Sequence, residues 1–271
     1  MQMLKISIVT ACYNAEDTIE QTILSVLEQD YPSIEYILID GGSTDGTVDI
    51  IRKYESKLAY WISEPDKGLY DALGKGFERV TGDVCAYINA DDFYQPHAFA
   101  TVCEIFQNRK HQWITGLNAT YNVFGQIVGT ELPCRYRSSF IRKGFYDGKR
   151  LPFIQQESTF WRAELMQYVD WDKFRTLCLA GDYYLWTCFS PYAELDIVKC
   201  ILSGFRKRNG QLSEAIDDYR KELGLFCSTQ VALSDRITIY ADKIMRLIHR
   251  RVNPDIIHFD FECEVWGNHK S

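Results

Sequence analysis

The first hundred residues alternate strand-like and helix-like segments at short intervals, and this alternation constrains the fold more than any other feature. Four apolar runs are typical of strands, at residues 5–10, 34–40, 58–63 and 84–89. Each is followed by a segment with helical spacing of apolar residues, at 17–28, 47–55, 69–80 and 95–108. Repeated strand–helix units predict an α/β fold with a mainly parallel central sheet, helices on both faces, and ligands bound at the carboxyl ends of the strands.

The pattern becomes less regular after residue 110. Residues 119–130 predict a hairpin around Gly125, and residues 132–153 form a polar stretch with few regular signals. A loop of that length is more often a lid or a binding segment than a spacer. Short helices are expected at 164–169 and 180–189, and an extended segment at 194–205.

The last part of the chain is expected to be helical, so we divide the chain into a domain over residues 1–215 and a C-terminal helical extension over residues 216–271. Residues 201–251 hold ten Lys and Arg and six Asp and Glu, a balance of +4. Near the end, one helix has an apolar stripe and a separate basic side. The stripe is Ile237, Tyr240, Ile244 and Ile248, and the basic side is Arg236, Lys243, Arg246 and Arg250.

Two interpretations of this helix stay open. The stripe can pack on the catalytic domain, which we favour, or the helix can make a peripheral contact with an anionic membrane surface.

Composition narrows the classes of partner and compartment. A formal net charge of −7 and a pI near 5.3 argue against nucleic-acid binding. Nine cysteines without a C-x-x-C pair favour reduced thiols in the cytoplasm. We find no signal peptide and no window near the ~20 apolar residues that a membrane-spanning helix needs. We therefore expect a cytoplasmic protein, with any membrane contact at the inner face of the cell membrane.

Chemically suggestive residues follow three of the predicted strands. Residues 10–14 combine an aromatic ring and an amide, which can hold a base or ribose, although a simple turn that caps the next helix also fits. Asp40 precedes two glycines at a strand end, where an acid points toward the binding crevice of an open sheet. Asp45 is better explained as a helix cap. No G-x-G-x-x-G follows the first strand, so a nicotinamide dehydrogenase is disfavoured.

The third strand end carries Asn89, Ala90, Asp91 and Asp92. Adjacent carboxylates repel each other unless a cation or water screens them, and hard oxygens suit Mg²⁺ or Mn²⁺ shared with phosphates. We assign Asp92 the plain role of capping the following helix.

Four ordered segments closely resemble the N-terminal half of family 2 glycosyltransferases. They are VTACYN at 9–14, IDGGSTDGT at 39–47, SEPDKGLYDALGKG at 63–76 and TGDVCAYINADD at 81–92. Within that family the chain is most similar to the branch that builds bacterial surface polysaccharides, including colanic-acid-type transferases. The resemblance is strong over residues 5–110 and loose over 150–215.

The resemblance implies a GT-A type nucleotide-sugar domain, a nucleotide-sugar donor and a divalent metal, Mn²⁺ or Mg²⁺. Family tendency favours UDP as the nucleotide, with GDP and dTDP left open. The resemblance places Asp40 at the uracil edge and makes Asp91 the metal-binding residue, since the first acid of the family's Asp-x-Asp is Asn89 here. Gly74 stands where relatives often have Asn. The donor-binding residues that it implies are Thr10, Ala11, Tyr13, Asn14, Asp40, Asp66, Lys67, Gly68, Asn89, Ala90 and Asp91.

On the acceptor side, Asp182 matches the position where the family keeps its catalytic base, and Gln156 and Glu157 match an acceptor-side segment. A carboxylate there can take the proton of an acceptor hydroxyl as it attacks the donor sugar, which inverts the anomeric centre. Without the resemblance, a helix cap explains Asp182 better, and a buried ion pair explains Glu157 equally well. Arg206 is expected to contact phosphate.

The predicted function is transfer of a sugar to a hydroxyl of a saccharide or lipid-linked saccharide in bacterial polysaccharide biosynthesis. A nucleotidyltransferase is the first alternative, although it usually has a Gly-rich basic loop after strand one, and residues 10–14 have none. A catalytically inactive nucleotide-sugar-binding module is the second, and Asp40, Asp91 and Asp182 in one chain argue against it. Specificity for donor sugar and acceptor is expected in residues 115–160, where the resemblance fades.

Overall fold

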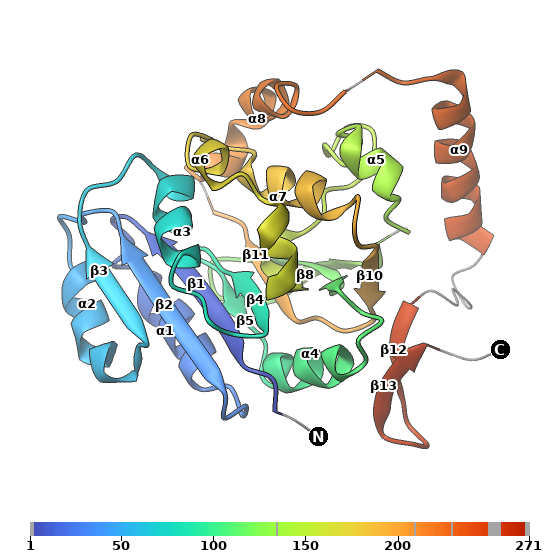
Figure 1. Cartoon of the computed structure of the whole chain (residues 1–271). Coiled ribbons are helices and arrows are strands. Elements are labelled where there is room, and N and C mark those ends of the chain that lie inside the picture. Colours follow the sequence, from blue (N-terminus) through green and yellow to red (C-terminus); the bar gives the residue numbers. More distant parts are fainter. Residues whose placement is uncertain (1–2, 134, 209, 229, 249–255, 269–271) are drawn as a thin grey trace.

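The computed structural model describes residues 3–133, 135–208, 210–228, 230–248 and 256–268, and these form a nine-stranded sheet and a four-stranded sheet. Helices lie on both faces of the large sheet (Figure 1). The predicted α/β class is confirmed, with a mixed, mostly parallel central sheet.

The N-terminal part is the parallel half of the large sheet, in the order β4-β1-β2-β3. In register, Ile6 pairs with both Ile34 and Val84, so the carboxyl ends of these strands meet at one edge. All four predicted strand–helix units are confirmed within a few residues. The strands are β1 (Ile6–Cys12), β2 (Ile34–Asp40), β3 (Tyr60–Ser63) and β4 (Val84–Tyr87). The helices are α1 (Ile19–Leu27), α2 (Thr47–Tyr54) with η1 (Glu55–Lys57), α3 (Leu69–Phe77) and α4 (Ala98–Gln107).

Beyond β4 the large sheet becomes mixed. β9 (Thr159–Arg162) runs antiparallel between β4 and β6 (Trp113–Thr115), and β10 (Leu195–Val198) then runs parallel to β6. We predicted neither β6 nor β9 from the sequence, because a strand of three or four residues is too short to show a periodic pattern of apolar residues. Both strands are buried, and the ring of Trp161 packs between Phe77 and Trp186.

The small sheet has the order β5-β11-β7-β8. The predicted hairpin is confirmed as β7 (Asn118–Tyr121) and β8 (Ile127–Glu131), with Gly125 in the turn at φ +76°. β5 (Phe93–Tyr94) was not predicted. The extended segment expected at 194–205 divides into β10 and β11 (Ser203–Arg206), which belong to different sheets.

Residues 132–153 are not an exposed lid. Most of their apolar side chains are buried in the main core, and the segment contains the helix α5 (Ser138–Arg142). The buried members are Tyr136, Phe140, Ile141, Phe145, Tyr146 and Leu151. The next elements are η2 (Gln156–Ser158), η3 (Ala163–Tyr168), α6 (Trp171–Phe174), α7 (Gly181–Phe189) and η4 (Leu212–Glu214). The short helices expected at 164–169 and 180–189 are confirmed as η3 and α7.

The C-terminal extension is helical only in part. After α8 (Ile216–Leu223) and α9 (Leu233–Ile248), the hairpin β12 (Ile256–Asp260) and β13 (Val265–Asn268) extends the large sheet next to β10. The expectation of helix throughout residues 216–271 is therefore wrong for this hairpin. The division of the chain at 215/216 stays a prediction.

The apolar stripe of α9 does not pack on the domain. Ile237, Tyr240 and Ile244 are 63%, 67% and 56% exposed, so the interpretation that we favoured is wrong for them. Another face of the helix is attached instead, by ion pairs of Asp235 with Lys143 and of Asp242 with Arg137. Arg250 lies outside the described residues, as do the side chains of Lys243, Arg246 and Ile248.

No helix in the described part of the chain is long and apolar enough to cross a membrane. The described cysteines are free thiols, as expected.

Candidate functional site

The end of β2 is organised around the carboxylate of Asp40, which is fully buried. Its Oδ2 accepts hydrogen bonds from the backbone N–H groups of Gly42 and Ser43, at 3.1 and 2.9 Å, and from the Ser63 hydroxyl at 2.6 Å. The Ser43 hydroxyl donates to the other oxygen. Asp40 thus holds the turn after β2 against the end of β3. Its predicted contact with a base stays a prediction.

Residues 10–14 lie beside this turn at the end of β1. Asn14 has a left-handed backbone, at φ +46°, and its side-chain oxygen accepts a hydrogen bond from the Thr44 N–H at 2.9 Å. Thr10 and Ala11 are buried, while the Tyr13 ring is 63% exposed. An exposed ring at the carboxyl end of a parallel strand offers a stacking surface for a planar ligand.

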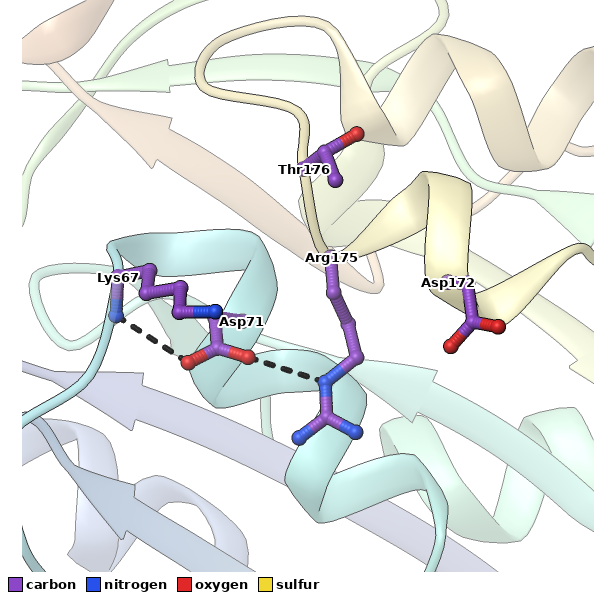
Figure 2. A pocket seen from close by; sticks show the side chains of 5 residues that line it. All are labelled: Lys67, Asp71, Asp172, Arg175 and Thr176. Carbon is purple, nitrogen blue, oxygen red and sulfur yellow. Dashed lines mark hydrogen bonds and ion pairs between the residues drawn. The ribbon is translucent and has the colours of Figure 1, made fainter.

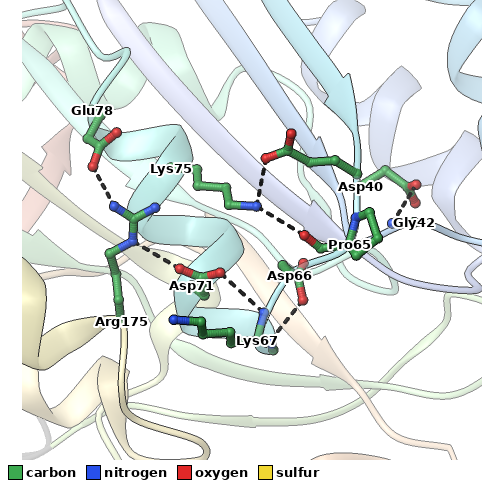
Figure 3. Close-up of polar contacts among 11 residues, drawn as sticks. Asp40, Gly42, Pro65, Asp66, Lys67, Asp71, Lys75, Glu78 and Arg175 are labelled. Carbon is green, nitrogen blue, oxygen red and sulfur yellow. Dashed lines mark hydrogen bonds and ion pairs between the residues drawn. The ribbon is translucent and has the colours of Figure 1, made fainter.

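The loop after β3 is held from two sides (Figure 3). The carboxylate of Asp66 accepts from the Gly68 N–H at 2.8 Å, and the Lys67 N–H donates to Asp71 on α3 at 3.2 Å. Lys75, also on α3, binds the Glu64 carboxylate at 2.8 Å.

This loop also lies directly against the turn after β2. A Cβ built on Gly41 would come within 2.6 Å of Asp66 Oδ2, so a glycine allows the close approach. The structure thus brings together the segments around Asp40 and Asp66, which the sequence placed after different strands.

A cavity of about 560 Å³ opens next to this loop (Figure 2). Its lining comes from the α3 region and from α6, and consists of Lys67, Asp71, Asp172, Arg175 and Thr176. Arg175, directly after α6, links this helix to α3. Its guanidinium binds Asp71 at 3.0 Å and Glu78 at 2.6 Å (Figure 3). The Lys67 ammonium makes no ion pair with any other residue that the structure describes. The positive charge of Lys67 therefore lies between the loop after β3 and the cavity.

Asn89 and Asp91 follow β4 at the same sheet edge. Asp91 Oδ2 accepts hydrogen bonds from Arg208 and Gln211, both at 3.0 Å. The side-chain oxygen of Asn89 is buried and accepts no hydrogen bond from any residue that the structure describes. Both therefore offer hard oxygen atoms to a cation.

The donor set fits a divalent metal that is shared with a ligand. Among the described residues, no group of three or more His, Cys, Asp or Glu side chains is placed to enclose a metal ion. Mg²⁺ commonly takes one or two protein carboxylates and completes its shell with phosphate and water oxygens. Asp91, with the unpaired oxygen of Asn89 nearby in sequence, matches that mode.

The prediction that Asp92 caps a helix is wrong. The next helix, α4, begins at Ala98, whereas Asp92 is fully buried and accepts from the Arg206 N–H at 2.7 Å. Burial raises the pKa of Asp92 well above its ordinary value, and the charges of Glu157 and Asp91 add to this rise in pKa.

The predicted phosphate contact of Arg206 is not supported either. Its side chain is 5% exposed, lies over the Phe93 ring and donates to Gln21. Arg208, two residues later, is the cation beside Asp91. No pattern in the sequence pointed to Arg208, because β11 ends at Arg206 and strand alternation does not extend beyond it.

Gln156 and Glu157 lie on η2, behind the Asn89 segment. The Gln156 amide donates to the Tyr87 carbonyl at 2.6 Å and accepts from Asn89 at 3.5 Å. Glu157 is 6% exposed. Burial raises the pKa of Glu157 above its ordinary value, and the negative charges of Asp182 and Asp91 raise this pKa further. The carboxylates of Asp91, after β4, and of Asp182, on α7, thus both act electrostatically on Glu157.

Asp182 is the second residue of α7, and the helix cap is Ala180, so the capping explanation is wrong. Burial raises the pKa of Asp182 to about 7, even though hydrogen bonds from Tyr183 and Tyr219 lower it. A carboxylate with a pKa close to the working pH is suited to proton transfer. Sequence reasoning missed Tyr219, because it comes from α8, 37 residues further along the chain.

The site therefore has two sides. One side offers the exposed ring of Tyr13, the loop around Lys67 with its ammonium group, and the carboxylate oxygens of Asp91 as donors for a metal. The other offers a buried carboxylate able to accept a proton near neutral pH. This arrangement can bind a charged, planar ligand next to a group that accepts a proton.

Comparisons with known proteins agree with this arrangement. The family model described as Glycosyl transferase family 2 matches residues 7–168. An uncharacterized glycosyltransferase of Mycobacterium tuberculosis is 38% identical over 166 residues, covering 59% of this chain and 60% of the relative. The putative teichuronic acid biosynthesis glycosyltransferase TuaG of Bacillus subtilis is 36% identical over 107 residues, 38% of this chain and 42% of TuaG. The chain thus spans about three fifths or less of the length of these relatives.

Two solved structures share the fold. TarS 1–349 of S. aureus, in complex with UDP-GlcNAc, has a TM-score of 0.64 at 16% identity, covering 91% of this chain and 73% of TarS. The mannosyltransferase PcManGT from Pyrobaculum calidifontis, in complex with GDP-Man and Mn²⁺, has a TM-score of 0.56 at 16% identity, covering 90% and 65%.

Proposed function

The chain belongs to glycosyltransferase family 2, and from this premise we propose that it transfers a sugar from a UDP-sugar to a hydroxyl of a saccharide or lipid-linked saccharide, with inversion. The observation that carries the proposal is that the buried carboxylate of Glu157 feels the negative charges of both Asp91, the predicted metal residue, and Asp182, the predicted base. The biological setting that we propose is bacterial polysaccharide biosynthesis, supported by the name of TuaG.

On the donor side, the Tyr13 ring stacks on the base, and the turn around Asp40 holds the nucleoside. The choice of UDP is supported by the UDP-GlcNAc complex of TarS. Lys67 and Arg208 bring positive charge to the diphosphate, with the backbone of Asp66 and Gly68 as its support. Arg208 takes over the role that we predicted for Arg206.

On the acceptor side, Asp182 takes the proton of the acceptor hydroxyl as its oxygen bonds to the anomeric carbon. The bond from that carbon to the diphosphate oxygen breaks in the same displacement, so the configuration inverts. A divalent metal held through Asp91, when bound, stabilises the negative charge on the departing diphosphate. Gln156 and Glu157 shape the acceptor side next to Asp182.

A screen of UDP-, GDP- and dTDP-sugars with and without Mn²⁺ tests the donor, first by melting temperature and then by transfer to saccharide and lipid-linked acceptors. A ligand at ~100 times its Kd stabilises the folded state by about 2.7 kcal/mol. We expect the largest Mn²⁺-dependent shift with a UDP-sugar, and transfer from the same donor. Stabilisation without transfer to any acceptor indicates the inactive binding module, and release of diphosphate from a nucleoside triphosphate indicates a nucleotidyltransferase.

The exposed stripe of α9 supports a peripheral contact with an anionic membrane at the cytoplasmic face, as a lipid-linked acceptor requires. Leu233, Ile237, Tyr240 and Ile244 face solvent at helical spacing, and such a face can enter the headgroup region. Flotation with anionic vesicles should fall when these four residues are replaced by serine. Phe124→Ser is the matched control, since this side chain is 84% exposed elsewhere. Equal flotation of both variants and the parent chain would exclude the contact.

A further inference from the structure

We infer that α8, beyond the segment that matches the family model, supplies two positioning residues for the proton-accepting carboxylate, Tyr219 and Glu222. The inference deepens the proposed function and rests on it, because it concerns the predicted base Asp182. It also assigns α8 to the catalytic domain, although our division of the sequence at 215/216 separates the two.

Glu222 fixes the backbone that leads into α7. Its carboxylate accepts hydrogen bonds from three successive N–H groups, those of Cys178 and Leu179 at 2.7 Å and of Ala180 at 2.5 Å. These groups precede the first turn of α7, where a negative charge is also favourable toward the helix dipole. Asp182 is two residues after Ala180. Glu222 therefore determines where the backbone of Asp182 lies.

Tyr219 acts on the carboxylate itself. Its hydroxyl lies 3.4 Å from Oδ1 and 3.5 Å from Oδ2 of Asp182, between the two oxygens. Hydrogen bonds of catalytic groups are often long without substrate and shorten when it binds. A donor so placed favours the charged carboxylate and fixes the direction in which it faces.

α8 is itself anchored firmly enough to position other groups. Leu223 is 1% exposed, and a Cβ on Gly144 would come within 2.3 Å of it. The Tyr219 ring packs edge-on against Phe153, with centroids 5.8 Å apart. The helix is thus packed against the segment 132–153, which we had expected to be a lid or a binding segment.

The two residues should change the titration of Asp182 in opposite directions. The groups that act on it are the Tyr219 hydroxyl, the Glu222 and Glu157 carboxylates, the Tyr70 phenol and the Tyr183 N–H. The Tyr219 hydrogen bond lowers the pKa of Asp182, whereas the charge of Glu222 raises this pKa. Removing the first should therefore raise the pKa of Asp182, and removing the second should lower it.

The experiment compares Tyr219→Phe, Glu222→Gln and the control Asp218→Asn, whose carboxylate is on the exposed side of the same helix and pairs with Lys221. We expect kcat to fall about tenfold in Tyr219→Phe, in the range of a lost hydrogen bond to a charged group, with UDP affinity unchanged. The acid limb of the pH–rate profile should move to higher pH in Tyr219→Phe and to lower pH in Glu222→Gln. Asp218→Asn should change neither.

NMR of ¹³C-labelled aspartate carboxyls provides a second readout that needs no substrate, with the Asp182 signal assigned from Asp182→Asn. Opposite pKa shifts of Asp182 in the two variants support the inference. Equal titration in the parent chain and both variants overturns it, even if transfer is normal. A parent chain that transfers no sugar while these shifts occur contradicts the proposed function and leaves the positioning intact.

Discussion

The two sides of the site are built in different ways. On the donor side, Asp40 binds N–H groups two and three residues away, and Asp66 binds the N–H of Gly68. On the acceptor side, Tyr219, the hydrogen-bond partner of Asp182, is 37 residues away in sequence. The charges of Asp182 and Asp91 raise the pKa of Glu157. Around Asp40 and Asp66, turns that are local in sequence therefore shape the donor side, and only Asp91 is held there by partners far along the chain, Arg208 and Gln211. On the acceptor side, long-range packing sets the proton affinity. Changes on the two sides should affect separate properties, binding on one and chemistry on the other.

The largest separation is expected for Asp182→Asn. The variant keeps the size of the side chain and most of its hydrogen bonding but cannot take a proton. Positioned bases contribute ~10²- to 10⁴-fold, so transfer should fall by about that factor while UDP affinity stays within a few-fold. Transfer rate and UDP affinity are measured on one preparation.

Asp170→Asn is the matched control, because the Asp170 side chain caps α6 by accepting from the Lys173 N–H at 3.0 Å. It should cost at most ~1 kcal/mol of stability and leave turnover unchanged. Near-normal transfer by Asp182→Asn would move the search for the base to Glu157.

A smaller effect, on binding alone, is expected for Asp91→Ala. This variant loses the carboxylate that we assign to the metal, so the enhancement of UDP binding by Mn²⁺ should disappear, a loss of tenfold or more. Calorimetry with and without Mn²⁺ measures it. Asp49→Ala, which removes an exposed carboxylate on α2, serves as the control. Unchanged metal-dependent affinity in Asp91→Ala would remove Asp91 from the metal site.

The smallest effect is expected for Gly41→Ala, which tests how the two donor-side loops meet. The new Cβ must displace the Asp66 carboxylate, 2.6 Å away, from its hydrogen bond to Gly68. UDP affinity should fall by about tenfold or less, in line with ~1 kcal/mol for one hydrogen bond, while the rate with saturating donor is kept. Gly129→Ala is the control, since nothing lies within 4 Å of a Cβ there. Equal UDP affinity in both variants would show that the contact does not shape the donor side.

The same contrast between local and long-range contacts explains which elements could be predicted from the sequence. The strands β1 to β4 and the helices α1 to α4 were predicted because each strand is a continuous apolar run followed by a helix of regular periodicity. The strands β6, β9 and β12 were missed because they are short and depend on neighbours far away in the chain. For the polar stretch 132–153, the lid, one of two roles expected, is excluded, because the core buries aromatic residues that are spread through it without period.

In the site, too, the surroundings of single residues could be predicted only where they do not depend on contacts far along the chain. The turn at Asp40 follows from the glycines after an acid at a strand end, whereas the loop at Asp66 was implied by the resemblance to family 2 glycosyltransferases. Arg206 was predicted to contact phosphate, but its side chain lies over the Phe93 ring at the end of β11, whereas Arg208, after β11, reaches Asp91. Asp92 was taken for a cap because the burial of its carboxylate against the Arg206 backbone involves a contact 114 residues away.

The central claim, that a buried carboxylate of the acceptor side accepts the proton, is tested most directly by the pH profile of kcat/KM for sugar transfer. A base must be deprotonated to act, so a pKa raised to about 7 for Asp182 means that activity is lost as the pH falls below about 7. Because Glu157 also interacts with Asp182, the midpoint is an apparent value for the pair. The account predicts an acid limb centred near pH 7, over a range where melting temperatures show the protein folded. Full activity down to pH 5, as an exposed carboxylate would give, would contradict it.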